Sequence, residues 1–316
     1  MTTTVLIPEH FESDLAPRSG ELGVNFIPYD PEGRPLRDPS GAAALFRWWI
    51  PRAQGDRLIE TIPTLWWIHT GSAGVDHILT PAFLASNIQL TNSAGVHAVS
   101  ISEWVVAAML SITKDLPRMR EQQRSRIWEK VERPELGRQQ VVILGAGEIA
   151  GHISRRLRAF DVTVTAVRRR ASPDARFDAV ALVSDLPALL KSADWLIIAV
   201  PLTAETRGLV NRSMMEQIPS TGRVVNVARG EIVDEGALVD LLREGRLAGA
   251  VLDVFQEEPL PSAHPFWTLD GVTLLPHTTW RSPRVKERQL DLFLRNLRHF
   301  VASESLENLV DVRAGY

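Results

Sequence analysis

The chain alternates between short apolar runs and longer stretches in which apolar residues recur every three or four positions. Apolar runs bounded by glycine, proline or asparagine predict buried strands, and the longer spacing predicts helices between them. In the first hundred residues the predicted strands are 3–7, 24–27, 42–49, 65–68 and 88–92. A short helix is predicted near 56–62, so this part of the chain should form a small α/β unit.

A second alternating region starts at Gln139. Its first strand, residues 141–144, is continuously apolar, which is typical of a parallel strand covered on both faces. Further strands are predicted at 162–167, 195–200, 223–227, 250–254 and 272–275, with helices near 185–191 and 235–244. Repeated βα units of this kind predict a doubly wound parallel sheet with a ligand crevice beyond the carboxyl ends of its strands.

Two helical stretches frame this second region. Residues 97–127 show helical spacing, and Pro117 should interrupt or kink the helix. This helix could carry the chain between domains and also form a subunit contact, although a buried core helix explains its periodicity equally well. The last predicted helix, 283–302, follows the completed sheet and can return to the first domain.

The turn after strand 141–144 has the pattern of a dinucleotide site. Gly145 permits a tight turn, Gly147 allows a pyrophosphate to approach the backbone, and a helix from Glu148 directs amide donors at phosphate. Ala150 replaces the third glycine of the usual motif, and Gly151 lies beside it. Since glycine turns before helices are common in α/β proteins, the motif alone leaves an ordinary turn open.

Composition narrows the possible partners. With 316 residues, 45% of them hydrophobic, the chain can form two ordinary domains. A net charge of −3 gives no general attraction to nucleic acid or anionic membranes, so a small molecule is the expected partner. There is no cysteine, no basic leader and no apolar run near the ~18 residues of a membrane span, which predicts a soluble cytoplasmic protein. The histidines show no metal-ligand spacing.

Five segments resemble the D-2-hydroxyacid dehydrogenase family and occur in that family's order. They are GAGEIAG (145–151), VPLTAETRGLV (200–210), NVARG (226–230), LDVFQEEPLP (252–261) and PHTTW (276–280). Weaker matches, GSAGVDH at 71–77 and NSAGVHAVSISEW at 92–104, extend the resemblance to the N-terminal region.

The resemblance implies two doubly wound parallel-sheet domains. A Rossmann coenzyme domain, residues 97–282, would be inserted in a flavodoxin-like substrate domain made of residues 1–96 and 283–316. The resemblance also implies a homodimer.

The residue types at the strand ends suit the reduction of a 2-oxo acid, which needs a cation for the carboxylate, a proton donor and hydride from a nicotinamide. Arg229 can bind a carboxylate with two parallel hydrogen bonds. His277 is the candidate acid and needs a carboxylate partner to hold its imidazolium. By resemblance that partner is Glu258, directly before proline, instead of Glu257, and Asp253 contacts the nicotinamide carboxamide or ribose.

Coenzyme choice depends on the end of the strand after the glycine turn. NAD-using relatives carry an acidic residue there, whereas this chain has Arg168, followed by Arg169 and Arg170. Arginines offer charge-assisted bonds to a 2′-phosphate, so NADP(H) is expected to be preferred, with NAD(H) possible. A solvated basic loop is the alternative. The other predicted coenzyme residues are Gly145, Gly147, Glu148, Ile149, Pro201, Thr206, Ala228 and Asp253.

Substrate residues are less well defined by the sequence. The turn containing Ser72, Ala73 and Gly74 could bind a carboxylate through its backbone amides, although it could also be a plain turn. Five tryptophans could approach the crevice or belong to the core, namely Trp48, Trp49, Trp66, Trp67 and Trp280. His69 and His97 are expected to line the crevice. A pocket lined by tryptophan suits a short 2-oxo acid such as glyoxylate or hydroxypyruvate.

The sequence thus predicts an NADPH-dependent 2-oxo acid reductase. The alternative is a dinucleotide-sensing scaffold similar to the family's co-repressor branch, which would bind coenzyme with little turnover. A relative acting on a D-amino acid or phosphite is a third possibility. Formate oxidation is disfavoured, because relatives with that activity have glutamine in place of Glu258.

Overall fold

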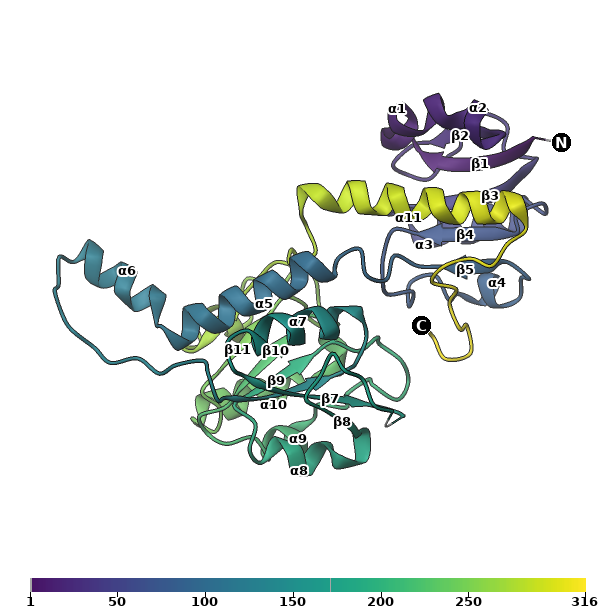
Figure 1. Ribbon diagram of the computed structural model, residues 1–316. Helices are drawn as coiled ribbons and strands as arrows, with labels where there is room; N and C mark the ends of the chain where they lie inside the picture. Colours follow the sequence, from purple (N-terminus) through teal and green to yellow (C-terminus); the bar gives the residue numbers. More distant parts are fainter. Residues whose placement is uncertain (1, 171) are drawn as a thin grey trace. The chain divides into compact units, whose positions relative to one another are not determined.

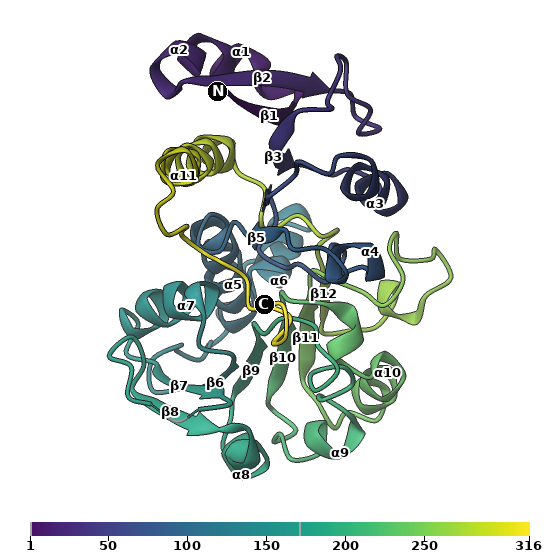
Figure 2. The same cartoon turned by 90° about the vertical axis from the view of Figure 1, so that its right-hand side faces the viewer.

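The computed structural model describes residues 2–170 and 172–316. The chain divides into two compact units, which are described separately (Figures 1 and 2). The first unit comprises residues 1–96 and 282–316, and the second comprises residues 97–281.

The first unit contains a five-stranded sheet in the order β2-β1-β3-β4-β5, with every neighbouring pair parallel. This is the flavodoxin-like order, in which the chain reverses direction across the sheet beside β1 and β3. The strands are β1 (Thr3–Pro8), β2 (Val24–Tyr29), β3 (Ala42–Arg47), β4 (Trp67–Thr70) and β5 (Gln89–Thr91).

Short helices and one long C-terminal helix complete the first unit. They are η1 (Glu9–Phe11), α1 (Glu12–Leu15), η2 (Ala16–Arg18), α2 (Ser19–Leu22), α3 (Arg52–Thr61), α4 (Pro81–Leu84) and α11 (Pro283–Ala302). The Ser282 side chain caps α11 by accepting a hydrogen bond from the Arg284 amide. Phe293 of α11 stacks on Phe46 of β3 with ring centroids 4.4 Å apart, so the C-terminal helix packs on the N-terminal sheet.

The second unit contains a seven-stranded parallel sheet in the order β12-β11-β10-β9-β6-β7-β8. Strand order reverses between β6 and β9, the position where doubly wound folds bind their ligands. The strands are β6 (Gln140–Leu144), β7 (Thr163–Arg168), β8 (Ala179–Leu182), β9 (Trp195–Ile198), β10 (Arg223–Asn226), β11 (Gly249–Leu252) and β12 (Val272–Leu274). The edge strand β8 was not predicted, because it is short and only half-buried.

The helices of the second unit include a pair in the stretch 97–127, where a helix interrupted or kinked at Pro117 was predicted. They are α5 (Ala98–Thr113), α6 (Leu116–Arg124), α7 (Glu148–Arg158), η3 (Val183–Asp185), α8 (Leu186–Leu190), α9 (Arg212–Met215), η4 (Gly230–Ile232), α10 (Glu235–Arg243) and η5 (Pro265–Trp267). The break lies at Asp115, which has φ 51°, and Pro117 occupies the first turn of α6. Proline is tolerated there because first-turn amides lack helical partners.

Strand β6 shows why its sequence is continuously apolar. Val142 and Leu144 belong to one hydrophobic cluster of the second unit, whereas Val141 and Ile143 belong to the other. Successive side chains of a strand point to opposite faces, so both faces of the sheet are covered.

Within residues 2–170 and 172–316, no helix combines the length and apolar character needed to cross a bilayer. In the same ranges no three histidine, aspartate or glutamate side chains gather in a way that could hold a metal ion.

His69 lies in the interior of the first unit, so the expectation that it lines a crevice is wrong. The residue is on β4 with 0% of its surface exposed, and its Nδ1 lies 2.8 Å from the Thr91 hydroxyl. Desolvation by burial lowers the pKa of His69 to about 3. The ring is therefore neutral in the folded protein at neutral pH.

This burial predicts acid sensitivity of folding. An unfolded histidine binds a proton below about pH 6.5, whereas folded His69 does so only near pH 3, so acid favours unfolding. Between pH 7 and 5 this group should lower the free energy of unfolding by about 2 kcal/mol. We expect urea unfolding to show that, between pH 7 and 5, the free energy of unfolding of His69→Gln falls by about 2 kcal/mol less than that of the wild type. The control His299→Gln should keep the full decline, and an equal decline in both variants would contradict the assignment.

Candidate functional site

The predicted site residues of the second unit follow the carboxyl ends of its parallel strands. They are Gly145 after β6, Arg168 at the end of β7, Pro201 after β9, Arg229 after β10, Asp253 after β11 and His277 after β12. Because all seven strands are parallel, these ends lie along one edge of the sheet.

The glycine turn fits a dinucleotide. Gly145 has φ 117°, and a Cβ there would lie 2.4 Å from the Ala199 carbonyl oxygen, so glycine is required. Gly147 is the N-cap of α7, and a Cβ built on it meets no atom within 4 Å. Open space thus faces the first turn of α7, where the amides of Glu148 and Ile149 have no partner within the helix.

Two predicted coenzyme residues shape the loop after β9. The Thr206 hydroxyl donates to the Pro201 carbonyl at 2.7 Å and accepts from the Thr203 amide at 2.8 Å. These bonds close a compact loop beside the point where strand order reverses.

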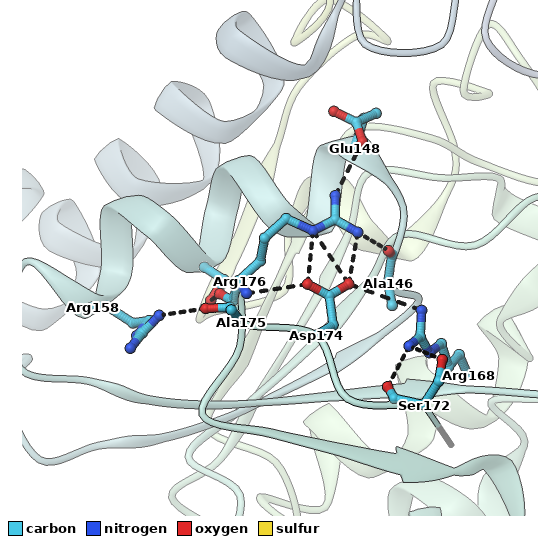
Figure 3. Close-up of polar contacts among 9 residues, drawn as sticks. Ala146, Glu148, Arg158, Arg168, Ser172, Asp174, Ala175 and Arg176 are labelled. Atoms are coloured by element: carbon cyan, nitrogen blue, oxygen red, sulfur yellow. Dashed lines mark hydrogen bonds and ion pairs between the residues drawn. The ribbon is translucent and has the colours of Figure 1, made fainter. Parts of the chain in front are cut away.

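Arg168 lies among polar groups that sequence reasoning missed (Figure 3). One terminal nitrogen donates to the carbonyl and the hydroxyl of Ser172. The other lies 3.9 Å from Asp174 Oδ2. Arg169, the next residue, is exposed and contributes to lowering the pKa of Glu205. The predicted basic loop therefore contains an acidic residue, and no motif in the sequence marked Asp174 as a neighbour of Arg168.

His277 and Glu258 form a hydrogen-bonded pair. His277 Nδ1 lies 2.8 Å from Glu258 Oε2, and Glu258 Oε1 accepts from the Phe255 amide at 3.0 Å. His277 has φ 47°, an uncommon conformation for a residue with a side chain. Its amide donates to the carbonyls of Asp253 and Leu275, at 2.9 and 3.0 Å, which hold this backbone in place.

The charges around this pair favour an ionised Glu258. Burial on its own raises the pKa of the Glu258 carboxyl, but the His277 hydrogen bond, the Phe255 amide and the charge of Arg229 together lower it below its usual value. Arg229 donates from Nη1 to the Ala228 carbonyl at 2.7 Å, and the Asn226 side chain donates to the Arg229 carbonyl at 2.9 Å. Arg229 and Glu258 therefore interact electrostatically in the second unit.

Asp253 holds the loop that carries His277. It is 2% exposed, and its carboxylate accepts from the Thr278 amide at 2.8 Å and the Thr279 hydroxyl at 2.5 Å. Burial raises the pKa of Asp253 despite these bonds. Its predicted contact with coenzyme stays a prediction, whereas its contact with the histidine loop is direct.

Trp280, also in the second unit, contacts the same loop. Its indole nitrogen donates to the His277 carbonyl at 3.0 Å, and its ring meets His97 edge to face with centroids 5.7 Å apart. The half-buried indole thus lies three residues from the candidate acid.

The predicted substrate turn belongs to the first unit, at the carboxyl end of β4. The Ser72 hydroxyl donates to the Gly74 carbonyl at 2.8 Å, and Asn92 donates to the Ala73 carbonyl at 2.9 Å. Trp48, directly after β3, covers the start of the turn so closely that a Cβ on Gly71 would lie 2.4 Å from its ring. Ser72, Ala73, Gly74 and Trp48 are all partly exposed.

The other tryptophans named above are either buried in the core or largely exposed to solvent. Trp67 is fully buried in the core of the first unit and stacks near Phe293, so the core position is the correct one of the two alternatives for this residue. Trp66 and Trp49 are 65% and 66% exposed. Trp66 and Trp67 differ in exposure because successive side chains along a strand point to opposite sides of the sheet.

Comparison with known proteins identifies relatives over the whole length. A family model described as "D-isomer specific 2-hydroxyacid dehydrogenase, NAD binding domain" matches residues 106–279. A glyoxylate reductase of Thermofilum pendens is 33% identical over 80% of this chain and 77% of its own length.

Solved structures of proteins from the same family superpose on this chain. A D-isomer-specific 2-hydroxyacid dehydrogenase from Xanthobacter autotrophicus, in complex with NADPH and MES, superposes with a TM-score of 0.86 and 27% identity, covering 100% of this chain and 99% of that chain. An NADPH-dependent glyoxylate/hydroxypyruvate reductase from Sinorhizobium meliloti, in complex with NADP and sulfate, has a TM-score of 0.84 and 26% identity, with 99% and 100% coverage. The chain belongs to the D-isomer-specific 2-hydroxyacid dehydrogenase family.

Proposed function

We propose that this protein reduces a small 2-oxo acid to the D-2-hydroxy acid with NADPH. The observation that carries the proposal is the hydrogen-bonded pair of His277 and Glu258, which follows the same sheet edge as Arg229 and the glycine turn. A proton donor, a carboxylate-binding cation and a dinucleotide turn are the groups that this reduction needs.

The bound nicotinamide coenzyme supplies the hydride, and the protein supplies charge and a proton. Arg229 binds the substrate carboxylate and polarises its carbonyl. His277 Nδ1 is occupied by Glu258, which leaves Nε2 to donate a proton to the carbonyl oxygen. The ionised Glu258 accepts a hydrogen bond from the ring and fixes its orientation, the role a carboxylate has beside a catalytic histidine.

Residues along the sheet edge would hold the coenzyme. Gly145, Gly147 and the amides of Glu148 and Ile149 suit the pyrophosphate. The loop residues Pro201, Thr206, Ala228 and Asp253 complete the proposed binding region. The open space at Gly147 supports this part of the proposal.

NADPH preference rests on Arg168. A guanidinium at the end of β7 attracts a 2′-phosphate, where an acidic residue would repel it. The relatives solved with NADPH and NADP support this choice. NADH use at lower efficiency is compatible with the same site.

The proposed substrates are glyoxylate, hydroxypyruvate or a similarly short 2-oxo acid. The named reductases among the relatives support this class. The proposed substrate residues are Ser72, Ala73, Gly74 and Trp48 of the first unit and Trp280 of the second, with the backbone amides of the turn suited to a carboxylate in addition to Arg229.

Replacing His277 by glutamine tests the proton donor. We expect kcat to fall by about 10²–10⁴-fold, because an amide cannot deliver the proton. NADPH affinity, measured by fluorescence titration, should change little, and the control His299→Gln should keep full activity. Retained turnover in His277→Gln would remove the residue from this role.

Replacing Arg168 by methionine tests coenzyme choice. The variant should lose about tenfold or more in kcat/KM with NADPH and little with NADH, because only NADPH has the 2′-phosphate. Initial rates with both coenzymes measure this. Arg155→Met, which removes a charge from the exposed side of α7, should leave the ratio unchanged. A wild-type preference for NADH would contradict the assignment.

The alternative function is a dinucleotide-sensing scaffold with little turnover. It predicts tight coenzyme binding without reduction of any 2-oxo acid in a panel assayed with both coenzymes. The His277–Glu258 pair favours the enzyme, because binding alone needs no oriented acid.

We also propose a homodimer formed through the region of α6. This helix projects from the body of the second unit (Figure 1). It and the residues after it expose Leu116, Met119, Ile127 and Trp128, the last to 93%. Exposed apolar groups gathered on a projecting helix favour burial against a second copy.

Trp128→Ser should therefore weaken the dimer, because it removes the largest apolar side chain from this surface. Sedimentation velocity should show a shift toward monomer at micromolar concentration. The control Trp267→Ser, at another exposed tryptophan, should sediment like the wild type. A monomeric wild type would exclude the proposal.

A further inference from the structure

The Arg176 side chain joins the glycine turn to the loop that carries Arg168 (Figure 3). Arg176 Nη2 donates to the Ala146 carbonyl at 2.9 Å, and Nη1 donates to Glu148 Oε1 at 3.0 Å. On its other side it pairs with Asp174, with Nε–Oδ1 at 3.0 Å and Nη2–Oδ2 at 2.8 Å. One guanidinium thus bonds to two parts of the predicted coenzyme site.

Gly151 makes room for this side chain. A Cβ at Gly151 would lie 2.9 Å from Arg176 Nη1 and 3.0 Å from its Cδ. The Arg176 carbonyl accepts from the buried Ser154 hydroxyl of α7 at 2.6 Å, which fixes the backbone at the same place. The glycine that follows Ala150 in the motif is therefore explained by Arg176.

Asp174 lies between two arginines but pairs mainly with one. Its carboxylate makes short, two-pronged contacts with Arg176, whereas the nearest Arg168 nitrogen is 3.9 Å away. The Nε of Arg168 is buried and donates no hydrogen bond to any of the residues that the structure describes. Hydrogen bonds from Arg176 are the main cause that lowers the pKa of Asp174 to about 2, so the carboxylate is charged at neutral pH.

We propose that Arg176 is a positioning residue for coenzyme selectivity: it retains the Asp174 carboxylate and thereby leaves the Arg168 guanidinium to the 2′-phosphate of NADPH. The inference rests on the proposed NADPH preference. Without Arg176, Asp174 has Arg168 as its nearest cation. A carboxylate paired with Arg168 competes with the phosphate for the same donors and repels its charge.

The bonds of Arg176 to the glycine turn have a different effect. Ala146 and Glu148 border the pyrophosphate region, which NADPH and NADH share. Loss of these bonds would weaken both coenzymes alike. The ratio of the two affinities therefore isolates the effect transmitted through Asp174.

The test measures equilibrium binding of NADPH and NADH, by fluorescence titration, to wild type, Arg176→Met, Asp174→Asn and the double variant. Arg176→Met should lower the NADPH-to-NADH affinity ratio by about tenfold. The double variant should recover it to within about threefold of wild type, since no carboxylate remains to compete. Calorimetric binding of 2′,5′-ADP should follow the same order.

Each result has a distinct meaning. A wild type that prefers NADH contradicts the proposed coenzyme, whereas a wild type that prefers NADPH together with an unchanged ratio in Arg176→Met overturns the role of Arg176. If Asp174→Asn loses the wild-type NADPH-to-NADH affinity ratio, Asp174 helps to hold Arg168 in place. That result also overturns the proposed role of Arg176. If Arg176→Met does not fold, as judged by circular dichroism, loss of the wild-type ratio in Asp174→Asn still overturns the proposal.

Discussion

Burial of β6 on both faces is the constraint on which the second unit depends. Its four apolar residues, 141–144, alternate between two hydrophobic clusters, so helices must cover both sides of the sheet. Helical crossovers make the neighbouring strands parallel, and parallel strands end at one edge. The glycine turn, the arginines and the histidine pair meet along that edge for this reason, although they are far apart in the sequence.

Two pairs of opposite charge lie at that edge. Glu258 orients His277, and Asp174 binds Arg176 beside Arg168. We propose that the first pair serves the transfer of a proton, and that in the second pair Arg176 keeps a carboxylate from Arg168, the arginine proposed to recognise a phosphate. The backbone supports this arrangement, since Asp253 holds the loop of His277 through Thr278 and Thr279.

Much of the fold could be predicted because its signals are local. The predicted helix 283–302 has the bounds of α11, and most predicted strands agree with observed ones to within a few residues. Prediction was wrong where tertiary contacts decide. Strand β8 was missed, and His69, expected at the crevice, lies in the core. The predicted interruption of the helix at 97–127 is present, with the break at Asp115 instead of Pro117. Periodicity does not distinguish a buried strand residue from one that lines a crevice.

The sequence by itself determined the family, the two α/β sheets and the identity of the candidate groups, because glycine turns and the motifs around Arg229, Glu258 and His277 are contiguous. The resemblance also predicted the pair of His277 and Glu258, whereas tertiary structure alone decided which charges lie beside Arg168. Asp174 and Arg176 belong to no motif, and Arg176 reaches the glycine turn across 28 residues of sequence from Glu148. Electrostatic pairing depends on distance in space, and folding, not sequence order, determines that distance.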